Sequence, residues 1–317
     1  LSVLSGATPY IARLDKHHDQ VFQPSFESRR QLSDYLTDYN PSNEFEGLLL
    51  DSMPYFVPTD LVEAYGQLAA ESDTRFGQST RNLVFDSPAF SVSSCFSEYA
   101  ARCAESGRLL VSVQHGGAGY GHAAGSPGET VEIELCDRFV SYGWKDHRLP
   151  DKTIPLPSLH LSSLKRSSKC RDSILYISFF GKRYLHELIT VPQTSQWDDY
   201  LDYGETFLKT LSPGGLAKVK FRPFYLRSYQ YPALMASLID GPQCEDRPAS
   251  RALSDCRLAV IDHASTSWLE AFTLDVPTIL FWNPAHWLFR PSAQPFIDQL
   301  HKAGILYYDP ISAARKI

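Results

Sequence analysis

Apolar and polar positions follow two kinds of pattern along this chain, and together these patterns predict an α/β fold. Short, nearly unbroken apolar runs are typical of strands buried in parallel sheets, whereas apolar residues repeated every three or four positions are typical of helices. In the first half, strands are expected at 48–50, 82–85, 109–113 and 138–142, and helices at 61–68 and 94–105. In the second half, strands are expected at 174–180, 217–222, 257–262, 277–282 and 304–308, and helices at 195–211, 267–274 and 292–303.

A polar, proline-marked stretch divides the two halves. It starts at Pro150 and continues through serine and basic residues to Arg171, a composition typical of interdomain linkers. We therefore expect one Rossmann-like domain over residues 1–160 and a second over 161–317. Parallel sheets bind ligands at the carboxyl ends of their strands, so a cleft between the two domains is the expected site.

Composition narrows the class of protein. The chain has 317 residues, of which 43% are hydrophobic and 21% charged, with a formal net charge of −6. These values are typical of a folded globular protein and give no overall attraction to nucleic acid. Six cysteines without a C-x-x-C pair favour reduced thiols in a cytoplasmic protein. Residues 1–6 look like an internal or trimmed start, which leaves further domains of a longer protein open.

A glycine-rich segment follows the predicted strand 109–113 directly. Gln114 and His115 stand at the end of the strand, and Gly116 and Gly117 come next. Glycines let the backbone approach a ligand closely and present its N–H groups, although a plain surface loop is the alternative.

The same segment contains a G-x-G-x-x-A pattern at 119–124 that is similar to a dinucleotide fingerprint. Its glycines come late after the strand, and the following residues 125–128 are not expected to begin a helix. A nicotinamide or flavin cofactor is therefore not expected.

Hydroxyl side chains gather at the start of the predicted helix 267–274. Ser265, Thr266 and Ser267 offer O–H and N–H donors to a phosphate, with His263 beside them, although a simple helix cap is the alternative. Glu270 on the first turn is a candidate partner for ribose hydroxyls. The sequence has no D-x-D motif, so no metal is expected. A sugar nucleotide with a single phosphate, such as a CMP-sugar, could be bound without one.

Taken in order, several motifs resemble those of bacterial surface-polysaccharide transferases. This group includes the retaining β-Kdo transferases, which move 3-deoxy-D-manno-oct-2-ulosonic acid (Kdo) from CMP-Kdo. The resemblance spans roughly residues 51–314, and it implies a GT-B-like architecture with the donor nucleotide mainly in the C-terminal domain. The motifs are QHGGxGYG at 114–121, the acidic segment ending in Asp137, YGW at 142–144, STSWLE at 265–270 and VPTI at 276–279.

The resemblance also implies roles for single residues. Arg222 and Pro223 stand where related CMP-sugar transferases carry a His-Pro motif, and Ser265-Thr266-Ser267 stands for their paired serines. The predicted donor-binding residues are Gln114, Gly116, Gly117, Arg222, Pro223, His263, Ser265, Thr266, Ser267 and Glu270.

Retention of configuration by two displacements needs a carboxylate nucleophile. Asp137 is the predicted nucleophile, facing the glycine loop, with Glu132 and Glu134 as alternatives. Glu63 is the predicted general acid/base, and His115 is expected to orient the donor sugar.

The expected partners are a nucleotide-sugar donor and an oligosaccharide or lipid-linked glycan acceptor in the synthesis of lipopolysaccharide O-antigen or capsule. No cofactor and no nucleic acid are expected, and the expected location is the cytoplasm, at the inner-membrane face. The alternatives are a sialyl- or glycerophosphotransferase and a non-catalytic nucleotide- or glycan-binding domain. The sequence does not identify the acceptor.

Overall fold

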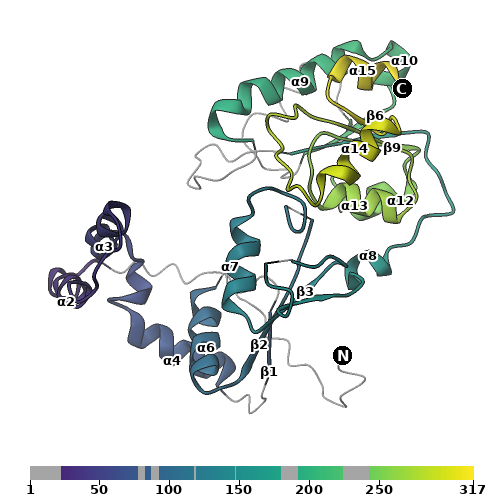
Figure 1. Ribbon diagram of the computed structural model, residues 1–317. Coiled ribbons are helices and arrows are strands. Elements are labelled where there is room, and N and C mark those ends of the chain that lie inside the picture. The colour runs from purple at the N-terminus through teal and green to yellow at the C-terminus, as the bar shows by residue number, and fades with distance from the viewer. Residues whose placement is uncertain are drawn as a thin grey trace. The chain divides into compact units, whose positions relative to one another are not determined.

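The computed structural model describes residues 23–77, 83–86, 93–117, 119–146, 148–179, 192–223 and 243–317 (Figure 1). They form two compact units. The first contains the described residues up to Val113 together with Glu134–Phe139, and the second contains Gln114–Ile133 and Val140–Ile317. This division departs from the predicted boundary at 160/161, because the segment after Val113 hydrogen-bonds to residues of the C-terminal half.

The second unit is built on a parallel sheet of six strands with the order β10-β9-β8-β5-β6-β7. This is the doubly wound order of Rossmann folds, in which the chain leaves the central pair of strands in opposite directions. The strands are β5 (Ile174–Ser178), β6 (Val219–Pro223), β7 (Gln243–Cys244), β8 (Leu258–Ile261), β9 (Thr278–Phe281) and β10 (Leu306–Tyr307).

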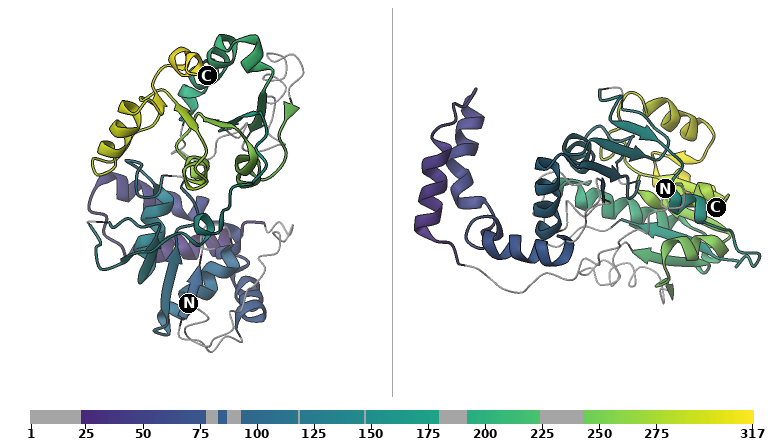
Figure 2. Two further views of the ribbon diagram at one scale, coloured as in Figure 1. Left: turned by 90° about the vertical axis from the view of Figure 1, so that its right-hand side faces the viewer. Right: turned by 90° about the horizontal axis from the view of Figure 1, so that it is seen from below.

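Helices cover both faces of this sheet (Figures 1 and 2). In β5, Leu175 and Ile177 pack with α12 (Ala249–Asp255), α13 (Thr266–Thr273) and α14 (Gln294–Lys302). The alternate residues Ile174 and Tyr176 pack with α9 (Trp197–Thr210) and α15 (Pro310–Arg315). All five residues of β5 are buried, which explains why the strand is an unbroken apolar run in the sequence.

A second sheet has the order β1-β2-β3-β4, with β1 and β2 parallel. Its strands are β1 (Leu83–Asp86), β2 (Leu109–Val113), β3 (Arg138–Ser141) and β4 (Thr153–Pro155). The described helices of this half of the chain are α2 (Phe26–Leu36), α3 (Glu44–Phe56), α4 (Tyr65–Phe76), α6 (Ser94–Glu105), α7 (Pro127–Leu135) and the short α8 (Leu159–Ser163). The predicted α/β fold with two Rossmann-like sheets is confirmed.

Three predictions of local structure are wrong. The run 48–50 lies inside α3 rather than in a strand, because Asn43 caps a helix that begins at Glu44. The helix expected at 61–68 begins only at Tyr65, after a 3-10 turn at Thr59–Leu61. Residues 125–128 do begin a helix, since α7 starts at Pro127, and proline is favoured at the first helical position.

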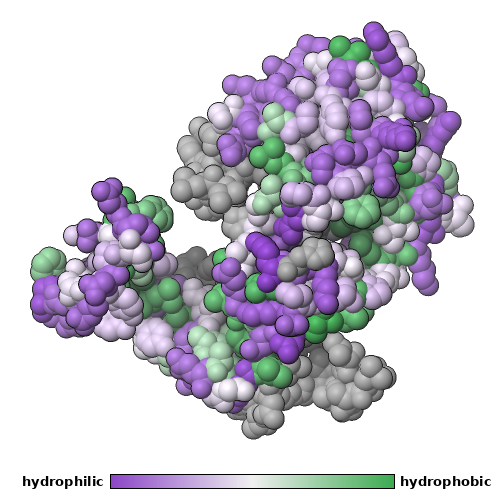
Figure 3. Space-filling model, viewed as in Figure 1, coloured by the Kyte–Doolittle hydropathy of each residue, from purple (hydrophilic) through white to green (hydrophobic). Residues whose placement is uncertain are grey.

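α2 and α3 lie side by side (Figure 2) and leave many apolar side chains at the surface (Figure 3). Phe26, Tyr55 and Phe56 are each more than four-fifths exposed. No helix among the described residues is both long enough and apolar enough to cross a membrane.

Candidate functional site

The strand order of the second unit places two polar strand ends beside each other. β5 ends at Ser178, its neighbour β8 is followed by Asp262, and both side chains are buried. Open α/β sheets bind ligands at this switch point, outside the carboxyl ends of the strands. The candidate site is therefore centred on the ends of β5 and β8.

Asp262 is the centre of a buried hydrogen-bond network. Its Oδ2 accepts hydrogen bonds from the hydroxyls of Tyr176 and Ser178, both at 2.8 Å, and its Oδ1 accepts one from the N–H of Phe179 at 3.2 Å. The hydroxyl of Tyr200 lies 3.0 Å from that of Ser178. A buried carboxylate is costly without such partners, so these donors offset the cost of holding Asp262 between the strand ends.

His263 is oriented by the same carboxylate. Its Nδ1 lies 3.0 Å from Asp262 Oδ1, and because a carboxylate only accepts, Nδ1 carries the hydrogen. The ring is fully buried, and its Nε2 has no hydrogen-bond partner in the part of the chain that the structure describes.

The N-cap of α13 lies three residues after Asp262. Ser265 occupies the N-cap position, but its side chain makes no capping hydrogen bond. The first N–H groups of a helix have no partner within the helix and carry the positive end of its dipole. Ser265 and Ser267 are each at most 9% exposed, so their hydroxyls stand at the start of the helix in a largely enclosed position.

The glycine loop packs against this helix. The N–H of Gly117 donates to Thr266 Oγ1 at 2.8 Å, so the middle hydroxyl holds the loop. A Cβ at Gly116 would lie 2.8 Å from Thr266 Oγ1, and one at Gly117 would lie 2.7 Å from Leu269 Cδ1. These two glycines therefore serve a close approach of loop to helix, whereas the sequence predicted an approach to a ligand.

A second contact fixes the far end of the loop. Arg290 donates from Nε to the carbonyl of Ala123 at 3.0 Å and from Nη2 to Glu129 Oε1 at 2.7 Å. The other oxygen of Glu129 accepts from the N–H of Gly121 at 2.6 Å. Glu129 is 1% exposed and Arg290 is partly buried, and their ion pair joins the loop to the segment after β9.

Gln114 braces the loop from within. Its Nε2 donates to the carbonyl of Gly116 at 2.7 Å, and its Oε1 accepts from the N–H of Tyr142 at 2.9 Å and from Trp144 Nε1 at 2.7 Å. Its side-chain amide is thus bonded to the protein itself and is 2% exposed overall. The structure therefore places Gln114 as a support of the loop rather than as a contact to a sugar.

His115, Tyr120 and Glu132 form a chain of polar contacts. The hydroxyl of Tyr120 donates to Glu132 Oε1 at 2.8 Å and lies 3.3 Å from His115 Nδ1. The hydroxyl oxygen therefore accepts from Nδ1–H, which leaves Nε2 of His115 as a proton acceptor. Burial lowers the pKa of His115, so its ring is neutral at pH 7. About a third of the side chain is exposed, and Glu132 is buried behind it.

Asp137 and Glu134 do not lie with these residues. Oδ2 of Asp137 accepts from the N–H of Leu110 at 2.8 Å, near the start of β2. The glycine loop leaves the opposite end of β2, four residues further on, which is about 13 Å away in an extended strand. Glu134 is exposed at the end of α7. The expectation that Asp137 faces the glycine loop does not fit this geometry, because Asp137 is bonded near the start of β2, whereas the loop follows the end of β2.

Glu63 forms an ion pair with Arg29. Its two oxygens accept from Nε and Nη2 of Arg29 in α2, both at 2.7 Å, and Oε1 also accepts from the N–H of Ser25. The hydrogen bond from Arg29 is the largest cause that lowers the pKa of Glu63 to about 2. A carboxylate held this way is a poor proton acceptor or donor near pH 7, so the predicted acid/base role does not fit this geometry.

The remaining predicted residues are bonded elsewhere. Nε of Arg222 donates to the carbonyl of Arg247 at 2.9 Å, and Pro223 is buried as the last residue of β6. Glu270, 7% exposed, lies 2.7 Å from Nε2 of His160 in α8. Glu270 therefore joins α13 to the segment before β5, and a role toward ribose stays a prediction.

Sequence reasoning did not select Asp262, Tyr176, Ser178 or Arg290. The sequence feature that could have indicated them is that Ser178 and Asp262 each follow an apolar run. Their adjacency depends on the strand order, which alternation alone does not give. Among the described residues, no group of three or more His, Cys, Asp or Glu side chains is placed to hold a metal ion.

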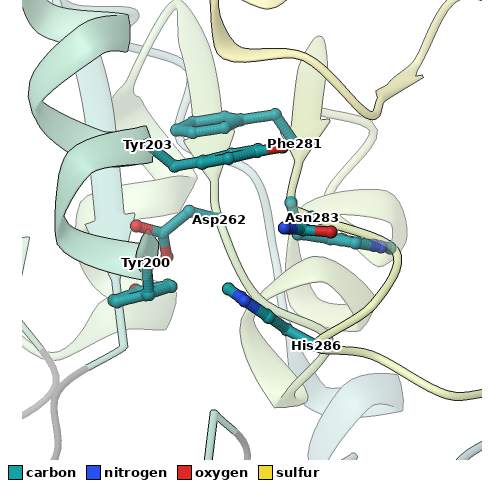
Figure 4. A pocket seen from close by; sticks show the side chains of 7 residues that line it. Tyr200, Tyr203, Asp262, Phe281, Asn283 and His286 are labelled. Carbon is teal, nitrogen blue, oxygen red and sulfur yellow. The ribbon is translucent and has the colours of Figure 1, made fainter. Parts of the chain in front are cut away.

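A small pocket opens beside Asp262, at the ends of β8 and β9 (Figure 4). The side chains that line it are Tyr200, Tyr203, Asp262, Phe281, Trp282, Asn283 and His286.

A Rossmann-ordered sheet, a polar switch point and a helix start without a side-chain cap make up the candidate site. The chain matches the sequence model of the LIC12162 family of transferases over residues 2–317. It belongs to this family. No curated protein matches it.

Solved structures show distant likenesses. A candidate UDP-N-acetylglucosamine 2-epimerase from Listeria monocytogenes matches with a TM-score of 0.48 at 10% identity, over 91% of this chain and 76% of the other. The glycotransferase of kitacinnamycin matches with 0.39 at 9% identity, over 98% and 77%. A UDP-forming α,α-trehalose-phosphate synthase from Burkholderia vietnamiensis matches with 0.38 at 10% identity, over 90% and 74%. Likenesses of this degree identify neither a substrate nor a reaction.

Replacement of Gly117 by alanine is expected to lower the free energy of unfolding by about 1–3 kcal/mol, since its Cβ meets Leu269 and the backbone of Thr266. Gly125→Ala is the matched control, because a Cβ there meets nothing within 4 Å. Urea unfolding followed by tryptophan fluorescence measures both. Equal midpoints for the two variants would show that the loop does not need its close contact with α13.

The Glu63–Arg29 pair predicts acid sensitivity of α2. Because the pKa of Glu63 is lowered from 4.5 to about 2, its stabilisation is complete above pH 4.5 and is lost as the pH falls toward 2. At pH 7, Glu63→Gln should speed hydrogen exchange of the α2 amides, and this difference should vanish near pH 2. Glu27→Gln, which alters an exposed pair within α2, is the control and should have little effect. Unchanged exchange in the Glu63 variant at pH 7 would contradict the assignment.

Proposed function

We propose that this transferase is a glycosyltransferase that moves a sugar from a nucleotide-activated donor to a glycan acceptor. The chain belongs to a family of transferases, which move a chemical group from one molecule to another. Its strand order is that of folds that bind nucleotides at the switch point of the sheet. CMP-Kdo is the favoured donor and a bacterial surface polysaccharide the favoured acceptor, with a GT-B-like arrangement, because the order of motifs is similar to that of β-Kdo transferases.

The start of α13 is the observation that carries this proposal. The N-cap Ser265 leaves the N–H groups of the first turn unbonded by its side chain, and the hydroxyls of Ser265 and Ser267 stand beside them. Such a helix start binds a phosphate through N–H groups and the helix dipole. The single phosphate of a CMP-sugar could therefore be held here as it leaves, without a metal ion.

His115 is the proposed general base for the acceptor hydroxyl. Its Nδ1 faces Tyr120 and Glu132, and its Nε2 makes no hydrogen bond within the described residues. A neutral imidazole with a fixed tautomer is suited to take a proton near pH 7. Glu132 acts through His115 and is therefore a positioning residue.

This arrangement favours direct displacement at the anomeric carbon. Attack by an activated hydroxyl inverts the configuration, whereas two displacements through a carboxylate retain it. Glu132 is 1% exposed and already accepts from Tyr120, so it is poorly placed to attack a sugar. Retention, which the resemblance implies, is the second candidate and requires Glu132 to reach the donor.

The first test compares donors. Incubation of the chain with CMP-Kdo, CMP-sialic acid or CDP-glycerol is expected to release CMP from CMP-Kdo, with no loss of rate when a chelator is added. NMR of the product then distinguishes inversion from retention. Release from one of the other donors alone would replace CMP-Kdo in the proposal. Binding of nucleotide without transfer, even in a single turnover, would point to a non-catalytic domain.

The second test concerns the proposed base. His115→Ala should lower kcat by about 10²–10⁴-fold and leave CMP affinity unchanged. Glu132→Gln should lower kcat less and leave KM for the donor unchanged. Asp137→Asn is the matched carboxylate control and should be close to the unaltered chain, because Asp137 contacts the start of β2. A folded but inactive Asp137 variant beside an active His115 variant would overturn this assignment.

A further inference from the structure

The helix α3 presents an apolar stripe to the solvent. Five of its apolar side chains are spaced by three, four or seven positions, so they lie along one side of the helix. The apolar stripe consists of Phe45, Leu48, Leu49, Tyr55 and Phe56, which are 49–82% exposed. Soluble proteins rarely leave so many neighbouring apolar side chains exposed, and a surface of this kind marks an interaction site.

The opposite side of α3 is fixed by contacts within the chain. Pro54 is buried, and its carbonyl accepts a hydrogen bond from Nη1 of Arg29, in α2, at 3.1 Å. The same nitrogen donates to the carbonyl of Val57, at the end of α3, at 2.7 Å. Because Nε and Nη2 of Arg29 are bonded to Glu63, one guanidinium joins α2, the end of α3 and the chain that follows. The apolar stripe is therefore carried on a helix whose other side is held in place.

Acidic side chains flank the apolar stripe. Glu44 and Asp51 are four and three positions from Leu48, so they are its neighbours on the surface of the helix. Both are exposed, and neither forms an ion pair with another residue that the structure describes. Residues 23–77 contain ten Asp and Glu, three Arg and no Lys or His, a formal charge of −7, whereas the whole chain carries −6. The surroundings of the stripe therefore attract positive charge.

Spacing and charge together select the class of partner. Apolar residues at steps of three and four positions form the seam of helix–helix packing, in which a second helix lays its own apolar side along the first. An anionic membrane or a second copy of this chain would bring negative charge toward an already acidic surface. A helix with an apolar side and basic residues beside it matches both features.

We propose that the apolar stripe of α3 docks a basic amphipathic helix of another protein. The apolar side of that helix lies along the stripe, and its Lys or Arg side chains pair with Glu44 and Asp51. Burial of apolar surface supplies the affinity, and the charges supply orientation and selectivity. The inference is independent of the proposed function, because the stripe belongs to the first unit, whereas His115 and the start of α13 belong to the second.

Fluorescence anisotropy of the whole chain with a labelled synthetic helix of leucine and lysine tests the inference. Leu48→Ser combined with Phe56→Ser should raise the Kd for this peptide about tenfold or more, because both changes remove apolar surface from the stripe. Leu159→Ser combined with Phe296→Ser is the matched control, since it removes the same two types of side chain from other exposed positions, and it should leave the Kd unchanged. Equal losses in the two double variants, or no binding to the unaltered chain, would overturn the proposal.

A charge exchange tests the ion pairs separately from the apolar contact. Glu44→Lys combined with Asp51→Lys should weaken binding of the lysine peptide roughly fivefold and strengthen binding of a peptide in which glutamate replaces lysine. Glu105→Lys combined with Asp151→Lys changes two exposed acids outside α3 and controls for the change in net charge. If this control shifts both affinities as much as the exchange on α3 does, the binding reports net charge alone and the proposal fails.

Other occupants of the stripe give different results. Sedimentation velocity should show the unaltered chain without the peptide as a monomer, and flotation with phosphatidylglycerol vesicles should leave it unbound. A dimer or a vesicle-bound form that disappears in the Leu48/Phe56 variant and persists in the Leu159/Phe296 control would assign the stripe to a second copy or to a membrane, against the proposal. Circular dichroism checks the fold of each variant, and Leu48→Ser alone replaces the double variant if that variant is unfolded.

Discussion

The buried carboxylate of Asp262 is hydrogen-bonded to side chains at both central strands of the six-stranded sheet. It accepts hydrogen bonds from Tyr176 and Ser178 on β5, orients His263, and lies three residues before the N-cap of α13. Its position follows from the strand order, because β5 and β8 are neighbours in this doubly wound sheet. An unpaired carboxylate at this depth would be strongly destabilising, so the ends of β5 and β8 and the side chains around them are fixed as a group.

The start of α13 is held from a second direction by a loop that comes from far away in the sequence. Gly117 reaches Thr266 over 149 positions, and Arg290 reaches Glu129 over 161. Such contacts explain why Gln114–Ile133 belong to the same compact unit as the six-stranded sheet. The domain boundary at 160/161 was predicted from the polar, proline-marked composition of residues 150–171. Such a composition indicates an exposed segment, but it does not indicate which segments pack together.

The sequence predicts the framework of the second unit well and the site only in part. Buried strands such as Ile174–Ser178 are visible as apolar runs, and the hydroxyls at 265–267 do begin a helix. Leu48–Leu50 was misread because a short apolar run fits a helix or a strand equally, and the capping by Asn43 decides for the helix. Asp137 was misplaced because nearness in sequence to the glycine loop says nothing about which end of a strand a residue occupies.

Besides His160, which pairs with Glu270, three histidines of the second unit share one arrangement, in which a carboxylate acts on a ring nitrogen. Asp262 holds Nδ1 of His263, Glu132 acts through Tyr120 on Nδ1 of His115, and Asp199 holds Nε2 of His286. The nitrogen that bears the hydrogen is therefore set by a neighbouring acid in each case. The free nitrogen is Nε2 in the first two rings and Nδ1 in the third, so the same pairing yields acceptors that point in different directions. This arrangement supports the proposal that His115, rather than one of these three acids, takes the proton of the acceptor.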